Sequence, residues 1–461
     1  MSFSSDELQQ YPVRLAELPQ GWMVSDIAAL ATNIQPGFPS GKHNQDGQGV
    51  PHLRPMNVSR DGSIDLTDLK YVLDQDGPRL NDGDVLFNNT NSPALVGKTA
   101  VVRRPSDWAF SNHMTRITPA RGVVPSYLAH HLHYLWMTGY LRHRCVNHVN
   151  QASISSGPLA SVPIAVPPSA EQERIVAAIE EQFSRLDAGV AALDAAFVKA
   201  GTLAKAAMEA AVSSWDQVPL REVLSSLRNG IFVSRPGTAP TRRAILRISA
   251  VRPLRLDAAE VRYVPESTTL GNEDAFRIDA GDLLFTRYNG NADLVGACAL
   301  VGAEAAGMLY PDKLIRAVVN KGRAMPDYLE IALNCGPSLR AIAERRKTTA
   351  GQVGISGSQL LSVPVPLPPL ADQERMVAQT RSVLDAVRRL RLETARARRR
   401  CEGLRSAVLA AAFSGKLVPQ NPDDEPVPVL LERIAAERAS ANGHKTANVR
   451  KPRTTRPKVS A

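Results

Sequence analysis

Cysteine pairs, long hydrophobic runs and a signal segment are all missing from this chain. The four cysteines among its 461 residues form no CxxC pair, which argues against a disulfide framework or a cysteine-bound zinc site. No run approaches the roughly 18 apolar residues that a membrane span needs, and the first ten residues lack an apolar signal core. We therefore expect a cytoplasmic protein that does not cross a membrane.

Complete catalytic motifs are missing as well. Gly97-Lys98-Thr99 resembles the end of a phosphate-binding loop, but Ser92 stands where that loop needs its earlier glycine. Asp68-Leu69-Lys70 resembles part of a nuclease motif but lacks the preceding Pro-Asp, and the Asn/Asp-Pro-Pro-aromatic tetrapeptide of amino methyltransferases does not occur. The sequence therefore favours a binding protein with no catalytic residue and no cofactor-binding residue.

Histidines gather in one segment of the first half of the chain. They are His130, His131, His133, His143 and His148. Partner residues at the spacing of a metal site are not evident, and the second half has no counterpart histidines. We expect a polar or DNA-facing helix here and assign no metal ligand.

Positive charge is in excess, with a formal net charge of +10 and a pI near 9.6. A positive surface attracts phosphates, so a polyanion partner such as nucleic acid is one interpretation, although many soluble proteins are basic. The remaining composition is that of a globular protein, 44% hydrophobic and 22% charged. At this length we expect more than one domain.

One phrase is written twice, as AVPPSAEQERIV at 165–176 and PLPPLADQERMV at 366–377. Prolines suit an extended exit from a domain, and the acidic residues after them suit the first turn of a helix. Pairs such as Gln172/Gln373 and Tyr127/Tyr328 keep a constant separation of 201 residues. Upstream the separation between matching segments changes by a few residues. There DGDVLF at 82–87 is similar to AGDLLF at 280–285, and LRPMNV at 53–58 is weakly similar to LRISAV at 246–251. A chance echo cannot produce this length of register, so we infer an internal duplication.

Two long helices should follow the two copies of the phrase, at about 170–212 and 371–413. Apolar and small residues alternate steps of four and three along both, which is the seam of a coiled coil. The expected seam of the second helix comprises Val383, Val387, Leu390, Thr394, Ala397, Cys401, Leu404, Val408 and Ala411. We expect the two helices to pair antiparallel; parallel pairing, or packing on another surface, is the alternative.

The globular parts, about 12–165 and 215–366, mix helix and strand. Residues 85–87, 99–102 and 283–285 read as strands, and 127–141 and 328–345 as helices. After residue 413 we expect a loop, a short amphipathic helix near 427–439, and a basic disordered tail. The fold class is thus α+β, or mixed α/β, of irregular topology.

This pattern resembles the specificity subunit of type I restriction-modification enzymes. The resemblance rests on the duplicated (V/L)PP…(E/D)QERxV phrase and on AAFSGKLVPQNPDDEPVPVLLERIAAERA at 411–439, and it covers nearly the whole chain. It implies a first target recognition domain (1–166), a first spacer helix (167–213), a second target recognition domain (214–367) and a second spacer helix (368–414). A C-terminal loop and helix (415–440) and a basic tail (441–461) would follow.

The resemblance also implies function and partners. Each domain would read one half of a split, asymmetric site in double-stranded DNA, and the helices would set the spacing and dock other subunits. Those partners would be two modification (methyltransferase) subunits and two restriction (ATPase/nuclease) subunits. S-adenosylmethionine, ATP and Mg would bind to the partners, and this chain would hold no cofactor and no metal.

Candidate DNA-binding residues are polar loop residues at matching places in the two halves, because base reading needs such side chains on loops that can enter a groove. The first pair of loops contains Asn88, Asn89, Asn91, Ser92 and Lys98, matched by Thr286, Arg287, Tyr288 and Asn289. The second pair contains Asn147, Asn150, Gln151 and Ser153, matched by Lys347, Thr348, Thr349 and Gln352. Solvated turns are the alternative, because Asn and Ser are common in turns.

Two rival functions stay open at this point. One is a coiled-coil scaffold with two peptide- or protein-binding domains, which would show no salt-dependent DNA binding. The other is an enzyme without a recognisable motif, which would turn over substrate as the purified chain.

Overall fold

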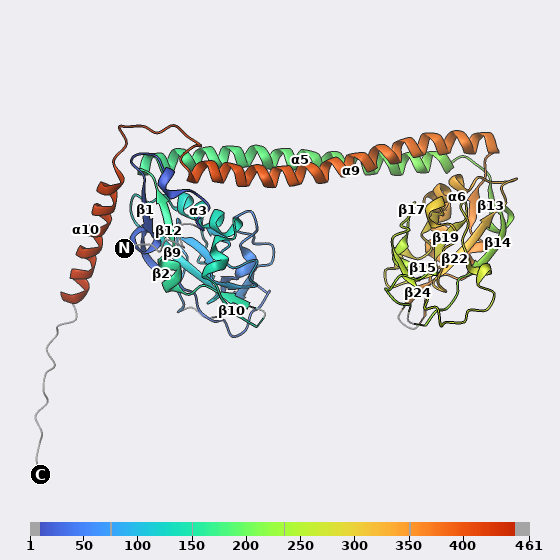
Figure 1. Cartoon of the computed structure of the whole chain (residues 1–461), viewed down its shortest axis with the longest axis horizontal. Coiled ribbons are helices and arrows are strands. Elements are labelled where there is room, and N and C mark those ends of the chain that lie inside the picture. Colours follow the sequence, from blue (N-terminus) through green and yellow to red (C-terminus); the bar gives the residue numbers. More distant parts are fainter. Residues whose placement is uncertain (1–9, 74–75, 150, 235, 350–351, 448–461) are drawn as a thin grey trace, which may run out of the picture. The chain divides into compact units, whose positions relative to one another are not determined.

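The structure is a computed structural model that describes residues 10–73, 76–149, 151–234, 236–349 and 352–447. It divides into two compact units (Figure 1). Unit 1 comprises Met1–Val190 with Ala397–Ala461, and unit 2 comprises Ala191–Arg396. Each unit therefore contains one globular domain and parts of both long helices.

The domain of unit 1 is built on a four-stranded antiparallel sheet. Its strands, in spatial order, are β2 (Ala31–Pro36), β9 (Met114–Pro119), β5 (Val85–Asn88) and β7 (Thr99–Val101). Smaller sheets pair β1 (Met23–Asp26) with β12 (Pro163–Val166), and β3 (Val50–Leu53) with β4 (Lys70–Val72) and β8 (Ala109–Phe110). Two short helices, α2 (Ile27–Leu30) and α4 (Ser156–Ala160), complete the domain together with α3 (Pro125–Met137). The central strand β5 is buried throughout, so the sheet is the core of the domain.

The domain of unit 2 repeats this plan. Its four-stranded sheet has the order β14 (Leu224–Asn229), β22 (Leu314–Val319), β19 (Leu283–Thr286) and β21 (Cys298–Leu300). Smaller sheets pair β13 (Gln217–Pro219) with β25 (Pro364–Pro366), β15 (Ala244–Leu246) with β18 (Val261–Tyr263), and β16 (Val251–Arg252) with β17 (Arg255–Leu256). Its helices are α6 (Pro326–Leu333), α7 (Gly336–Arg345) and α8 (Gly357–Leu361). The mixture of helix and strand confirms the expected fold class.

The long helices α5 (Ser169–Val212) and α9 (Leu370–Phe413) begin and end within one residue of the expected positions. In unit 1 the first half of α5 packs on the last half of α9, where the Arg405 guanidinium lies 4.5 Å from the ring centroid of Phe183. In unit 2 the partners are the last half of α5 and the first half of α9, where Phe197 and Leu384 line one cavity. The pairing inside both units is antiparallel, as expected.

One seam position of α9 was predicted wrongly. Leu404 is 52% exposed, whereas the side chain of Arg405 is only 17% exposed. Arg405 covers Phe183 and forms an ion pair with Asp187 of α5. The Arg405 side chain can take the covered position because its guanidinium stacks on the Phe183 ring and meets the Asp187 carboxylate, so the seam shifts by one residue here.

The duplicated phrase forms the joint between each domain and its long helix. Gln172 is fully buried; its side chain accepts a hydrogen bond from Val124 N (2.8 Å) and donates one to Pro167 O (3.0 Å). Gln373 repeats both bonds, with Met325 N (2.8 Å) and Pro368 O (2.8 Å). Val124 and Met325 cap α3 and α6, so one glutamine in each half ties the domain helix to the start of the long helix.

A tyrosine supports each joint. The Tyr127 hydroxyl donates to Ala165 O at 2.7 Å, and the Tyr328 hydroxyl donates to Pro366 O at 2.8 Å. Both side chains are buried, and both bond the last strand before the long helix. The duplication of Tyr and Gln seen in the sequence therefore reflects one repeated set of hydrogen bonds.

The expected domain helices differ from the structure at their ends. Residues 127–141 are α3, which ends at Met137, followed by a 3-10 turn over Tyr140–Arg144. Residues 328–345 form two helices, α6 and α7, because the chain turns at Cys335 and Pro337 lies in the first turn of the second helix.

The C-terminal helix α10 (Val427–Ala447) is longer than the predicted 427–439 and extends into the segment expected to be tail. It belongs to unit 1, and its residues Val427, Leu430 and Ile434 join the hydrophobic core of that unit. Asp424, just before it, pairs with Arg174 of α5 at 2.6 Å. Residues 448–461 lie outside the described residues.

The expectation of a polar or DNA-facing histidine helix is wrong for α3. His131 is fully buried, bonds the Tyr11 hydroxyl at 2.7 Å and stacks on Phe413 at 4.2 Å between ring centroids. His133 is 3% exposed and lies 3.1 Å from Arg60 O. Burial lowers the pKa of His131 to about 3 and that of His133 to about 4. These histidines are neutral core residues, because the end of α9 covers the helix.

Acid should destabilise unit 1 selectively. His131 and His133 take up protons on unfolding below their ordinary pKa of 6.5 but not in the folded chain, so stability is complete above pH 6.5 and falls toward pH 4. The cost is about 2 kcal/mol for each histidine at pH 5. Unit 2 contains no histidine and is the internal control. Hydrogen exchange, expressed as protection relative to the intrinsic rate at each pH, should show weaker protection of α3 at pH 5 than at pH 7.5, and H131Q should reduce the difference. An equal loss of protection in both units would contradict this assignment.

Candidate nucleic-acid interface

The two candidate loops of each half come together in one small sheet. In unit 1, β6 (Thr90–Asn91) pairs with β11 (Gln151–Ser153), which forms a hairpin with β10 (Val146–His148). In unit 2, β20 (Tyr288–Asn289) pairs with β24 (Gln352–Gly354), which forms a hairpin with β23 (Lys347–Thr349). In both units the hairpin lies at the end of the domain opposite the long helices (Figure 1). The internal repeat pairs each loop with its counterpart in the other half. It does not predict that the two loops within one half lie side by side.

The hairpin strands hold the exposed candidates. Asn147 and Gln151 are exposed in unit 1, where the neighbouring Val149 is 93% exposed. Lys347 and Thr348 are exposed in unit 2. Asn150 lies outside the described residues, and for Thr349 and Gln352 only the strand positions are described. These exposed side chains are available to a partner without any rearrangement of the domain.

Four candidates are buried inside the domains and in this structure cannot reach a base. Asn88 donates to Pro55 O (3.1 Å), and Lys98 donates to Pro55 O (3.3 Å) and Val58 O. Asn89 donates to the Thr115 hydroxyl (2.9 Å). Thr286 is fully buried at the position in β19 that Asn88 occupies in β5. Asn88 and Lys98 therefore hold the segment 55–58 in place, and burial lowers the pKa of Lys98.

The remaining candidates are half-buried where the small sheet meets the domain. Asn91 accepts a hydrogen bond from Ser92 N at 2.8 Å, and Ser153 lies beside Thr90 in the sheet. Arg287 donates to Asp312 O (3.3 Å), and its guanidinium lies 4.8 Å from the ring centroid of Tyr288. Stacking of this kind orients an arginine and leaves the other donors of the fork for a ligand.

A basic cleft of about 590 Å³ lies beside β20 in unit 2. Tyr288 and Asn289 line it together with basic side chains that the sequence analysis did not single out: Arg247, Arg252, Arg262 and Lys313. Phe232, which is 71% exposed, lies at the same cleft. Cationic side chains beside an exposed aromatic ring suit phosphates and bases. The LRISAV repeat could have identified Arg247; the others come together only in the fold.

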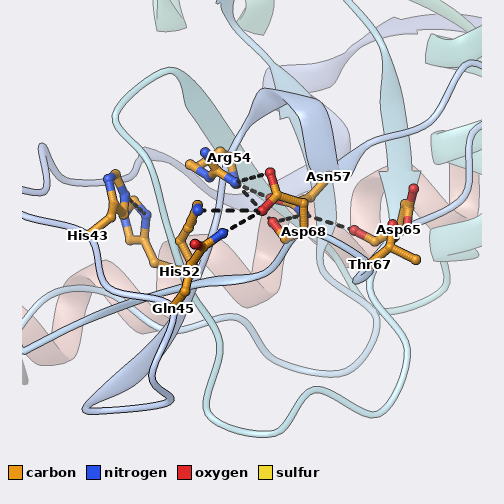
Figure 2. Close-up of polar contacts among 9 residues, drawn as sticks. His43, Gln45, His52, Arg54, Asn57, Asp65, Thr67 and Asp68 are labelled. Atoms are coloured by element: carbon orange, nitrogen blue, oxygen red, sulfur yellow. Dashed lines mark hydrogen bonds and ion pairs between the residues drawn. The ribbon is translucent and has the colours of Figure 1, made fainter. Parts of the chain in front are cut away.

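The corresponding place in unit 1 is a network centred on Asp68 (Figure 2). The Arg54 guanidinium lies 3.1 Å from the Asp68 carboxylate and donates to its main-chain oxygen at 2.9 Å. Gln45 donates to the same carboxylate at 3.4 Å, and the Lys70 ammonium lies 3.6 Å away. Asp68 and Lys70 therefore belong to a network of polar side chains at the surface.

In the part of the chain that the structure describes, no group of three or more His, Cys, Asp or Glu side chains is arranged to hold a metal ion. Among the same residues, every helix is too short or too polar to serve as a membrane span.

Two copies of one α+β domain, each followed by one of two paired long helices, define a fold class that known proteins share. A chain from a study of assembly and conformational transition of the type I R-M system superposes with a TM-score of 0.67 at 18% identity, over 87% of this chain and 99% of that one. The HsdS subunit from Thermoanaerobacter tengcongensis gives 0.52 at 18% identity, over 87% and 98%.

Sequence comparisons agree with the fold. The family model "Type I restriction modification DNA specificity domain" matches residues 19–189. The EcoKI specificity subunit of Escherichia coli K12 is 29% identical over 93% of this chain and 98% of its own length. The StySPI specificity subunit of Salmonella potsdam is 25% identical over the same shares. Over nearly its whole length this chain is therefore similar to type I restriction-modification specificity subunits.

Removing a buried candidate should cost stability first. In K98M the Val58 carbonyl loses its donor and the Pro55 carbonyl keeps only Asn88, which costs about 1–3 kcal/mol of unfolding free energy. N147A, at an exposed position of the hairpin, should change stability by less than about 0.5 kcal/mol. Chemical denaturation of both variants measures the difference. If K98M were as stable as N147A but bound DNA poorly, that result would indicate that Lys98 contacts DNA.

Proposed function

We propose that this chain is the DNA-reading, non-catalytic component of a type I restriction-modification complex. Each domain reads one half of a split, asymmetric site in double-stranded DNA. The observation that carries the proposal is the small sheet with its exposed hairpin, which recurs on the same scaffold in both units with different side chains. A common scaffold with exchanged surface residues is what two readers of different sequences need.

The partners in this proposal are two modification (methyltransferase) subunits and two restriction (ATPase/nuclease) subunits. S-adenosylmethionine, ATP and Mg bind to those subunits and not to this chain. The names of the relatives, which are specificity subunits of restriction enzymes, support this division of labour. The net charge of +10 supports the DNA partner.

Each hairpin should control one half of the recognised site. Replacing Lys347 and Thr348 by alanine removes polar groups that reach base edges, so one half of the methylated motif should relax or disappear. Replacing Asn147 and Gln151 should alter the other half and serves as the matched control. Single-molecule methylation mapping of cells that carry each variant measures both halves at once. Equal damage to both halves by one double variant would show that the hairpins hold the assembly together instead of reading bases.

The salt dependence of DNA affinity in the unaltered complex tests the general attraction to phosphates. The full-length chain with its modification subunits should lose affinity steeply between about 50 and 200 mM salt, because bound phosphates release counterions. A flat salt response of the unaltered complex, together with no split methylation motif in its host, would reject the proposed function itself.

The long helices should set the length of the unread gap. Deleting 186–192 together with 387–393 removes one seven-residue seam repeat from both helices and shortens each by roughly 10 Å, about three base pairs. The variant should assemble and methylate a motif with a shorter gap and unchanged half-sites. A four-residue deletion is the control, because it breaks the seam and should lower solubility. An active heptad variant with an unaltered gap would refute the spacer role.

A further inference from the structure

The Arg–acid network of unit 1 has a counterpart in unit 2. Arg54 follows β3, and Arg247 follows the equivalent strand β15. His52 pairs with Lys70 in the first unit and Ile245 with Arg262 in the second, in each case two residues before the arginine. An acid precedes each of these basic residues by two positions: Asp68 before Lys70, and Glu260 before Arg262. Arginine, acid and second cation therefore recur in the same register.

The distances show that each acid meets its arginine. Arg54 lies 3.1 Å from the Asp68 carboxylate, and Arg247 lies 3.2 Å from that of Glu260. Each carboxylate has a second donor nearby, which is Gln45 for Asp68 (3.4 Å) and Ser249 for Glu260. Figure 2 shows the Asp68 carboxylate facing both Arg54 and Gln45, with His43 and His52 to one side. Residue types differ between the halves, but the contact is the same.

The Arg247–Glu260 pair stands at the basic cleft that the proposed function assigns to DNA, and the Arg54–Asp68 pair occupies the equivalent strand positions in unit 1. Arg247, Ser249 and Arg262 line the basic cleft together with Tyr288 and Asn289. In unit 1, the segment that follows Arg54 is held by the buried Asn88 and Lys98. The side chains are only partly covered, 20% and 44% exposed for Arg54 and Asp68 and 45% and 39% for Arg247 and Glu260.

Fold stability does not explain these pairs, because a partly exposed ion pair contributes little to it. A carboxylate on a DNA-facing surface also repels phosphates. The hydrogen bond from Arg54 lowers the pKa of Asp68, so this charge is present at neutral pH. Both halves have a carboxylate at a position where it would repel phosphates. Because its ion pair adds little to stability, we look for a role of the carboxylate in binding.

Orientation of the arginine is that role. A guanidinium carries five N–H donors in a planar fork, and a carboxylate that takes one side of the fork leaves donors for the O6 and N7 acceptors of guanine. A fork held in advance loses less rotamer freedom on binding. Resting on the proposed function, we infer that Asp68 and Glu260 are positioning residues that hold Arg54 and Arg247 to read one guanine in each half-site.

The neutral isosteres D68N and E260Q test this inference in the full-length chain expressed with its modification subunits. Methylation mapping should show a relaxed guanine position in one half of the motif for D68N and in the other half for E260Q. Discrimination against a mismatch at that position should fall about tenfold. Affinity for a duplex that lacks the motif should rise, because a negative charge has been removed. R54A should lose both discrimination and this non-specific affinity, whereas R54K should lose discrimination alone.

Two further variants control for the loss of charge. E17Q and D274N remove the acid from exposed pairs with Arg14 (2.9 Å) and Arg277 (3.3 Å), and the motif should stay unchanged in both. A normal motif in D68N and E260Q, or relaxation of both halves by either one, overturns the inference, while the mapped motif of the unaltered chain leaves the proposed function standing. If one variant fails to fold, as thermal unfolding would show, the other still decides the result.

Discussion

A buried glutamine at each domain exit holds the molecule's architecture together. Gln172 and Gln373 each join three things: the proline-rich end of the domain, the capped start of α3 or α6, and the first turn of a long helix. An amide can do this because it offers an acceptor and donors on one short side chain. Its removal would leave buried main-chain groups without partners, which is more costly than the loss of one surface contact. The phrase is therefore repeated wherever a domain meets its helix.

With that joint in place, the far end of each domain is free to vary. The small sheet in both units is joined by main-chain pairing, and Ala152 and Val353 pack against the cores of their domains. Val146 and Asn147 in one half can thus be Lys347 and Thr348 in the other without loss of the fold. The buried polar residues have a different role. Asn88 and Lys98 donate hydrogen bonds to main-chain carbonyls of the segment 55–58 and so stabilise the domain.

The end of α9 shows how tertiary contacts change the meaning of a residue. Phe413 covers His131, and Arg405 covers Phe183. A histidine-rich helix that looks polar in the sequence is therefore core, and a charged residue takes a place that the periodicity assigns to Leu404. Both errors have one cause, because spacing along a helix shows which residues share a face but not what lies against it.

Much of the fold could be predicted from the sequence alone. The duplication, the bounds of both long helices, the central strands near 85–87 and 283–285 and the place of the candidate loops follow from local signals: proline stops, acidic first turns and periodic apolar residues. These signals act over a few turns of chain and survive without knowledge of neighbours. Only the tertiary structure decides which of the candidate residues are buried and which are exposed. Burial of Asn88, Lys98 and Thr286, the joining of two loops in one sheet, and the meeting of Arg54 with Asp68 depend on segments far apart in the chain. No local sequence pattern shows which distant segments meet. The same type of polar residue can be exposed and available to DNA, or buried and hydrogen-bonded to the main chain of its own domain.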